Sequence, residues 1–416
     1  MIRKIITSFI LFSVFASFAQ ESSSSPYSFY GIGDVKFKGT AETRSMGGVS
    51  VFADSIHLNL QNPAQLASLK ITSFAVGGTY LNTKLTSETQ KEKARRTTLD
   101  YLAIGIPTGK FAFGFGLIPY TAVGYKIQKL STDSDPLTTR YNGSGGINKV
   151  FFGMAYKLTK NINIGIDGNY NFGTIETTSL RFLDAVQYGT RETNHSELSG
   201  FNINAGLTFQ AKVKSKYTYF GSLVYSPVSD LTLQNEREIS TVQISSSGSA
   251  SIVDTQEIIV PDAKMKLPSK FSIGSGFGEV KKWLVGAEVT FQSNSDLKNR
   301  FDDINGVVFE NSTRYSLGGY FIPNFNSYSD YYKRITYRGG LRFENTGMVI
   351  QNKKIDDFAV NFGLGFPLGG TFSNINVNFE VGKRGTKYYN LVQENYFNVS
   401  LGLSLSDRWF VKRKYD

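Results

Sequence analysis

Apolar and polar residues alternate along most of the chain after residue 70. The clearest segments span residues 161–172, 201–210, 358–366, 374–381 and 397–405. In each segment one face carries mainly Phe, Val, Ile and Leu, whereas the other carries small, polar or charged residues such as Asn, Gly and Ser. A period of two predicts β-strands, because successive side chains of a strand point to opposite faces. The pattern therefore predicts an all-β protein.

The alternating segments number about 14, and the connections between them alternate in length. Short connections such as 107–110 and 212–216 are followed by long ones such as 128–146 and 234–266. An even number of antiparallel strands, with short turns at one end and long loops at the other, is typical of outer-membrane barrels. Closure of the sheet also removes its unpaired edges. We therefore predict a transmembrane antiparallel β-barrel of about 14 strands over residues 70–416.

The first 19 residues have the features of an export signal. Arg3 and Lys4 precede a mostly apolar run over residues 5–18, and Ser17 and Ala19 are small residues at a cleavage site. The run is shorter than the roughly 20 residues that a membrane-spanning helix needs. We expect a signal peptide over residues 1–19 that is cleaved, and a multi-pass barrel in the outer membrane of a Gram-negative bacterium.

Composition narrows the chemistry that the chain can support. It has no Cys and only two His, so we expect neither a disulfide nor a His- or Cys-ligated metal site, and no cofactor. We also expect no catalytic residues, because His195, Ser196 and Glu197 are merely sequence neighbours in a predicted loop. The net charge of +11 in an exported protein favours an anionic membrane surface or an acidic ligand over nucleic acid.

A basic cluster lies in the first predicted long loop, at residues 83–96. It consists of Lys91, Lys93, Arg95 and Arg96. Contact with outer-membrane lipid and lipopolysaccharide is one interpretation, and a simply solvated loop is the other.

Residues 20–69 lack the strand pattern. Residues 20–43 are polar and Gly-rich, and we expect them to be extended, whereas residues 44–69 are expected to fold as a hatch from the periplasmic side into the lumen. Within this hatch, Asn62, Pro63 and Ala64 predict a tight turn, since Asn caps turns and Pro restricts the residue before it. The turn either keeps the hatch compact or belongs to a hatch that moves, with Gly47 and Gly48 as hinges.

Several short motifs resemble the FadL family of outer-membrane transporters for long-chain fatty acids and other hydrophobic compounds. They are Ala53-Asp54-Ser55 and Asn62-Pro63-Ala64 in the hatch, and the stretches 267–274 and 337–343 in the barrel. The resemblance implies a 14-stranded barrel with an N-terminal hatch. It also implies that apolar ligands pass from an outer groove, past the hatch, to a lateral opening in the wall.

The third predicted strand, residues 111–127, carries Gly114, Gly116 and Pro119 close together. Gly often marks a bulge in a strand and Pro removes a ladder hydrogen bond. The family resemblance implies a kink that opens the wall at this strand, so these three residues are candidates for a lateral gate. Ordinary curvature of the barrel explains the same residues almost as well.

Charged residues fall on the inward face of several predicted strands. The alternation places Arg334, Arg338 and Arg342 inward on one strand and Arg314 inward on its neighbour. These guanidinium groups could bind the carboxylate of a ligand. The alternative, which we favour, is an ion-pair network that holds the hatch. The inward acidic partners would be Asp167, Glu288 and Glu380.

Two functions fit these features. The first is a channel for passive uptake of hydrophobic small molecules, similar to long-chain fatty acids, through an apolar groove, the hatch and the lateral opening. The second is an accessory barrel subunit that binds other outer-membrane proteins in a secretion or assembly complex, with the polar 234–266 loop as a contact surface. The identity of the ligand is not encoded in any local pattern, because apolar pockets are built from scattered positions.

Overall fold

The computed structural model of the chain describes residues 23–132, 136–184, 186–245, 248–301, 306–369 and 372–409. The predicted signal peptide lies outside this range. Within the described residues, no helix is long and apolar enough to cross a membrane.

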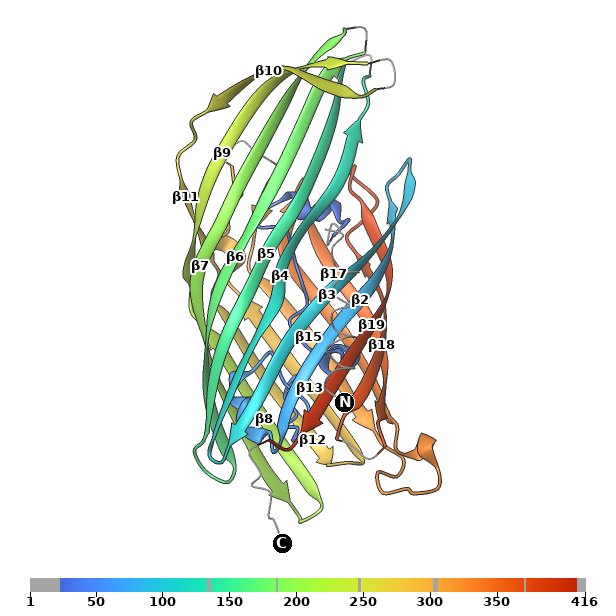
Figure 1. The fold of residues 1–416 in the computed structure, drawn as a ribbon. Coiled ribbons are helices and arrows are strands. Elements are labelled where there is room, and N and C mark those ends of the chain that lie inside the picture. The colour runs from blue at the N-terminus through green and yellow to red at the C-terminus, as the bar shows by residue number, and fades with distance from the viewer. Residues whose placement is uncertain are drawn as a thin grey trace, which may run out of the picture.

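The wall of the molecule is one antiparallel sheet that closes on itself (Figure 1). The last strand, β19 (Gln393–Asp407), pairs with β2 (Thr72–Thr86) and so completes the barrel. Between them the wall contains β3 (Lys91–Thr108), β4 (Phe111–Lys129), β5 (Leu137–Lys157), β6 (Ile162–Leu183), β7 (Tyr188–Val213), β8 (Tyr217–Ser226), β9 (Ser229–Ile244), β11 (Ala263–Leu267), β12 (Lys270–Glu279), β13 (Trp283–Gln292), β15 (Ser312–Phe321), β16 (Thr336–Ile350), β17 (Lys353–Pro367) and β18 (Asn374–Arg384).

Two of the wall strands are interrupted. β8 and β9 follow each other along the same edge of β7. On their other side, β11 pairs with β9 and β12 pairs with β8. Each pair therefore acts as one strand with a break, and the barrel has 14 strands, as the alternation predicted. Pro227 and Pro268 lie at the breaks, where a missing backbone N–H interrupts the ladder.

The remaining elements are short. The sheet includes β1 (Asp34–Val35) on β4, β10 (Ala250–Ile258) on β9 and β14 (Val307–Phe309) on β16. The helical elements are η1 (Pro26–Phe29), α2 (Ala41–Ser45), η2 (Pro63–Ser68), η3 (Asn294–Asp296) and η4 (Tyr331–Lys333).

The two faces of the wall differ in polarity as predicted. Phe358, Val360 and Phe362 of β17 are each more than 40% exposed on the outer face, whereas Asn376 and Asn378 of β18 are fully buried inside. A soluble protein would bury the apolar face. The reverse arrangement is that of a barrel whose outer face contacts lipid and whose inner face is polar.

The predicted long loops are mostly wrong, because the strands continue through them. β2 and β3 leave only residues 87–90 between them, and β7 alone has 26 residues. A barrel strand crosses a bilayer in about 9–11 residues, so these hairpins rise well beyond the membrane-crossing part of the wall. The taller side, which carries β4 to β10, is visible in Figure 1. On these extensions polar residues such as Thr174 and Glu176 are exposed, whereas apolar residues such as Ile175, Leu198 and Leu233 are buried. The apolar outer face that marks the predicted strands is therefore absent here.

Residues 23–38 are not a free extension but lie inside the barrel, in the half nearest the long hairpins. Ser25 donates a hydrogen bond from Oγ to Glu394 of β19. β1 pairs with Thr121 and Ala122 of β4, and Arg384 of β18 lies 2.6 Å from Asp34. The chain then descends through α2 and the hatch to β2 at the short-turn end.

The hatch is fixed to the wall at the turn around Asn62. Oδ1 of Asn62 accepts a hydrogen bond from the backbone N–H of Ala64 at 2.9 Å, which caps η2 as the sequence suggested. Its Nδ2 donates to Oγ of Ser222 in the wall at 2.9 Å. Glycines on the facing strands make this contact possible. A Cβ on Gly165 would lie 2.6 Å from the backbone of Pro63 and Ala64.

Replacement of Gly165 should therefore loosen the hatch. We expect Gly165→Ala to destabilise the folded barrel by about 1–3 kcal/mol, the usual cost of overpacking, seen as a lower denaturant midpoint and faster proteolysis of the hatch. Gly339→Ala is the matched control, because the nearest atom to its new Cβ is 4.0 Å away. Equal midpoints for the two variants would show that η2 is not packed against β6.

Candidate functional site

The hatch contacts the far wall through its two glycines and a serine. Gly47 and Gly48 have φ values of +67° and +92°, a conformation that other residues rarely adopt. A Cβ on Gly47 would also lie 2.5 Å from the carbonyl oxygen of Leu341. Glu288 of β13 accepts hydrogen bonds from the backbone N–H and Oγ of Ser50 at 2.9 and 2.8 Å. Both glycines are therefore required by the docked shape, and their role as hinges stays a prediction.

A histidine links three parts of the hatch near the short-turn end. Nδ1 of His57 lies 2.8 Å from Asp54, and its Nε2 lies 3.9 Å from Glu42 of α2. Burial by itself would lower the pKa of His57, but the carboxylates of Asp54 and Glu42 outweigh it, so the pKa is raised above its ordinary value. Asp54 is 45% exposed, so solvent screens this pair. The contact holds α2 against the loop before η2.

The inward arginines of β16 have protein partners. Arg342 lies 3.0 Å from Asp357 and 3.2 Å from Glu380. Arg338 donates to Oδ1 of Asn376 at 2.8 Å, and Asn376 in turn donates to Glu42 of α2. Arg338 is therefore linked to α2 through the amide of Asn376, as in the predicted network of lumen charges rather than in a free ligand site.

The other predicted lumen charges lie elsewhere. Arg334 ends η4 in the turn before β16, with its guanidinium 5.2 Å from the ring centre of Tyr331, so its predicted place in the arginine row of the lumen is wrong. The strand alternation does not extend into that turn. Asp167 accepts hydrogen bonds from Asn169 and Asn204 rather than pairing with an arginine. Of the three predicted acidic partners, only Glu380 pairs with one of the predicted arginines.

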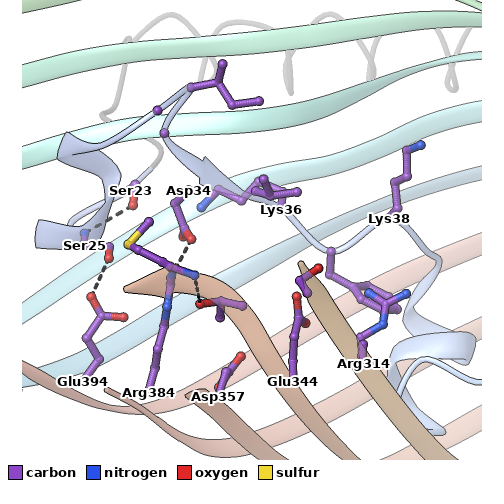
Figure 2. Close-up of a pocket in the computed structure, with 18 of the residues that line it drawn as sticks. Ser23, Ser25, Asp34, Lys36, Lys38, Arg314, Glu344, Asp357, Arg384 and Glu394 are labelled. Carbon is purple, nitrogen blue, oxygen red and sulfur yellow. Dashed lines mark hydrogen bonds and ion pairs between the residues drawn. The ribbon is translucent and has the colours of Figure 1, made fainter. Parts of the chain in front are cut away.

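A charged cavity of about 300 Å³ lies between residues 23–38 and the wall (Figure 2). On one side of the cavity the carboxyl groups of Asp34, Asp357 and Glu394 surround the guanidinium group of Arg384. Burial alone would raise the pKa of Asp34, but Arg384 and Lys36 outweigh it and the pKa is lowered. The carboxylate therefore stays ionised and holds the N-terminal segment against β18.

The opposite side of the charged cavity is strongly basic. Lys38 and Tyr120 line the cavity, and Lys38 and Lys149 lie over the Tyr120 ring at 5.7 and 5.8 Å from its centre. Lys149 does not line the cavity itself and is only 2% exposed. Lys270 interacts electrostatically with Lys38 and with Arg314, and all three residues line the cavity. No ion pair within the described residues includes any of these four cations.

This basic group was not predicted, apart from Arg314. Lys149 shares the inward face of β5 with Ile147 and Phe151, so the alternation could have placed it in the lumen. Lys38 could not be placed in this way, because residues 23–38 form almost no regular structure. An unpaired ammonium group away from water is costly, and an anion in the cavity would offset that cost.

A second, aromatic cavity of about 490 Å³ lies beneath the long hairpins. Phe29 of η1 packs against Tyr125 of β4 and Tyr141 of β5, with ring centres 5.3 and 6.0 Å apart. Further lining residues come from η1, β4, β6, β7, β16 and three loops. They include the apolar or aromatic Tyr27, Tyr30, Ile127, Phe301 and Leu391 and the polar or charged Thr177, Arg181 and Glu192. Tyr30 lines both cavities, so they adjoin each other across the N-terminal segment.

A buried arginine beside the aromatic cavity holds the backbone of η1 and the residues after it in place. Arg300, in the loop after β13, donates to the carbonyl oxygens of Phe29 and Gly31. Burial lowers the pKa of Arg300 to about 10, so the group remains charged at neutral pH. The loop thus fixes η1 at the boundary of the two cavities.

β3 and β4 are not hydrogen-bonded to each other in the half of the barrel nearest the long hairpins. These strands pair only from Leu102 and Leu117 down to the turn, although both continue for many residues toward the hairpins. The break follows the candidate gate residues. Gly116 lies against the β3 backbone, where a Cβ would collide with the carbonyl oxygen of Leu102, and a register shift follows Pro119. Gly114 faces the hatch at Leu66.

β1 partly covers this unpaired edge. Asp34 and Val35 pair with Ala122 and Thr121, so the N-terminal segment occupies the edge of β4 that β3 leaves free. A lateral gate at Gly114, Gly116 and Pro119 remains a prediction, but the interruption of the wall lies directly beside these residues.

Two surface features differ from their predicted setting. Lys91, Lys93 and Arg95 face outward on β3, whereas Arg96 donates toward the carbonyl oxygen of Ser23 inside. His195 and Ser196 occupy consecutive positions of β7 and so point to opposite faces. Ser196 is buried and donates to Asn235 instead. Within the described residues, no cluster of His, Asp or Glu could hold a metal ion.

The barrel is similar to several solved structures. The Pseudomonas putida toluene transporter TodX matches with a TM-score of 0.61 at 14% identity, covering 91% of this chain and 100% of that chain. The Ralstonia pickettii toluene transporter TbuX gives 0.59 at 14%, covering 89% and 99%. A Pseudomonas aeruginosa FadL homologue gives 0.58 at 11%, covering 90% and 98%. These likenesses establish the FadL-like barrel fold.

At the level of sequence, no curated protein matches the chain. A sequence model of the BamG family matches residues 1–416. Because this match spans the whole chain, the protein belongs to the BamG family.

Proposed function

We propose that the protein is an outer-membrane channel for passive uptake of apolar small molecules. The observation that carries this proposal is the aromatic cavity beneath the long hairpins. Its volume of about 490 Å³ lies within the range of small-molecule sites, and its lining of Tyr and Phe suits an apolar or aromatic ligand. In the proposed orientation, with the short turns periplasmic, this cavity opens toward the cell exterior.

The charged cavity supplies the second step of the route. Lys38, Lys270 and Arg314 line this cavity and have no ion-pair partner within the part of the chain described, although Glu288 and Glu344 lie close enough to act on Lys270. A carboxylate that passes Tyr30 would therefore meet a group of cations in which positive charge exceeds negative charge. The ligand class that matches both cavities is an apolar molecule with at most one carboxylate. An amphiphile similar to a fatty acid has this chemistry.

The unpaired edges of β3 and β4 supply the exit. A lateral exit suits an apolar ligand, because the ligand then enters the bilayer without crossing water. β1 must leave the β4 edge for this to happen, while Asn62 and Ser50 hold the hatch in place below. The moving part of the channel in this proposal is the N-terminal segment rather than the hatch.

Filling the aromatic cavity should block the channel. We expect Thr177→Trp to weaken binding of radiolabelled toluene by at least about tenfold, or ~1.4 kcal/mol, because the indole occupies the space of the ligand. Binding is measured on the protein in nanodiscs, with empty nanodiscs subtracted, and uptake in proteoliposomes.

Thr174→Trp is the matched control, since Thr174 lies on the same strand but faces outward and is exposed. If both variants bind toluene as the unaltered protein does, the aromatic cavity is not the site of uptake.

A second candidate, a subunit of an outer-membrane complex, is favoured by β10. This strand pairs only with β9 within the described residues and is exposed on both faces, so one edge can accept a strand from another protein. Purification in mild detergent should then give a stoichiometric partner that is lost when residues 250–258 are replaced by a Gly-Ser linker. A lone monomer from both preparations would exclude this role.

A further inference from the structure

The net positive charge of the chain is concentrated at the short-turn end of the barrel. The six turns at this end contain eight basic residues and one acidic residue, a net charge of +7, whereas the whole chain carries +11. Five of the six turns contain a lysine. These lysines include Lys110, Lys160, Lys214, Lys216, Lys281 and Lys282, all of which are exposed.

The densest part of this charge lies on two neighbouring turns. Lys214 and Lys216 precede β8, and Lys281 and Lys282 precede β13, with β12 between these strands. Lys216 and Lys282 each lie 3.6 Å from Glu279, which is the acidic group they share. The single negative charge of Glu279 thus lies beside four positive charges, and the surface of these two turns keeps a net positive charge.

An aromatic cluster lies on the outer wall directly beside these turns. The rings of Tyr217, Phe277 and Trp283 come from β8, β12 and β13, with centres 5.4 to 6.2 Å apart. The ammonium group of Lys216 lies 5.5 Å from the centre of the Tyr217 ring. Trp and Tyr are typical of the level at which lipid headgroups meet acyl chains.

The lysines and the aromatic cluster together indicate which class of ligand this surface fits. Val285, one step further along β13, is 54% exposed, so the cluster is continuous with the apolar outer wall. A ligand that uses the whole surface needs an acyl chain against Phe277 and an anionic group at the lysines. A soluble acidic protein would reach the turns but would leave the apolar wall beside them uncovered.

We propose that Lys214, Lys216, Lys281 and Lys282, with Tyr217 and Trp283, bind the headgroup of an anionic phospholipid in the leaflet at the short-turn end. The site rests on the proposed placement of the barrel in a membrane, but it does not depend on transport. It would select lipids by charge, because lysines near a bilayer surface attract anionic headgroups.

Trp283 gives a direct test, since the chain has only one other tryptophan, Trp409. In a Trp409→Phe background, Trp283 fluorescence is measured in phosphatidylcholine bilayers that contain brominated phosphatidylglycerol or brominated phosphatidylcholine at equal mole fraction. We expect an apparent affinity about fivefold higher for the anionic lipid, and the preference should decline as salt screens the lysines.

Substitution of Lys214, Lys216, Lys281 and Lys282 by Gln should abolish the preference. The matched control replaces Lys91, Lys93, Lys353 and Lys354, four lysines at the opposite end, and should retain it. Equal quenching by both lipids before any lysine is changed would overturn the proposal, and this comparison does not require the variant to fold. A preference that survives the four substitutions would also overturn it.

Toluene uptake by the same lysine variant separates this site from the channel. We expect uptake to remain unchanged, because the lysines lie outside both cavities. If the lysine variant loses the lipid preference but takes up toluene normally, the lipid site is supported. If the unaltered protein takes up toluene but shows no lipid preference, the lipid site is rejected and the proposed channel is not.

Discussion

The absence of water within a bilayer is the constraint on which the rest of this structure depends. Backbone groups in contact with lipid must be paired within the protein, so the sheet has to close, as β19 and β2 do. Closure with an apolar outer face places the polar side chains inside. Those side chains need partners in turn. The N-terminal segment supplies some of them through Ser25 and Asp34, and the hatch supplies others through Ser50 and Asn62.

The N-terminal segment, residues 23–38, also obstructs the lumen whose polar groups it pairs with. It separates the aromatic cavity from the charged cavity, and its strand β1 lies on the one stretch of β4 that β3 does not pair. The hatch is held by buried side-chain contacts and close glycine approaches, whereas β1 is held by two register pairs and the ion pair of Asp34. In the proposed channel, a route through the barrel would therefore depend on residues 23–38 more than on the hatch.

The fold can be predicted from the sequence because residues that face lipid are apolar and alternate with residues that face the lumen and are polar or small. Phe358 and Asn361 are examples of the two kinds. The signal vanishes in the hairpins beyond the membrane, where the outer face is no longer apolar, so the sequence predicts loops where strands continue. Asn62 can be assigned to a turn from its neighbours. The cavities cannot be predicted, because lining residues such as Tyr120 of β4 and Arg384 of β18 come together only after closure. The predicted position of Arg334 fails because β16 begins only at Thr336.

The central claim is that β1 must leave the edge of β4 for a ligand to pass. Val35 and Thr121 are register partners, and the chain has no cysteine, so Val35→Cys with Thr121→Cys forms a single defined crosslink. Tyr80→Cys with Thr97→Cys joins two strands that are already paired and serves as control. The account predicts that oxidation of the first pair stops toluene uptake into proteoliposomes, that reduction restores it, and that the control pair has no effect. Full uptake with the first crosslink intact would contradict it.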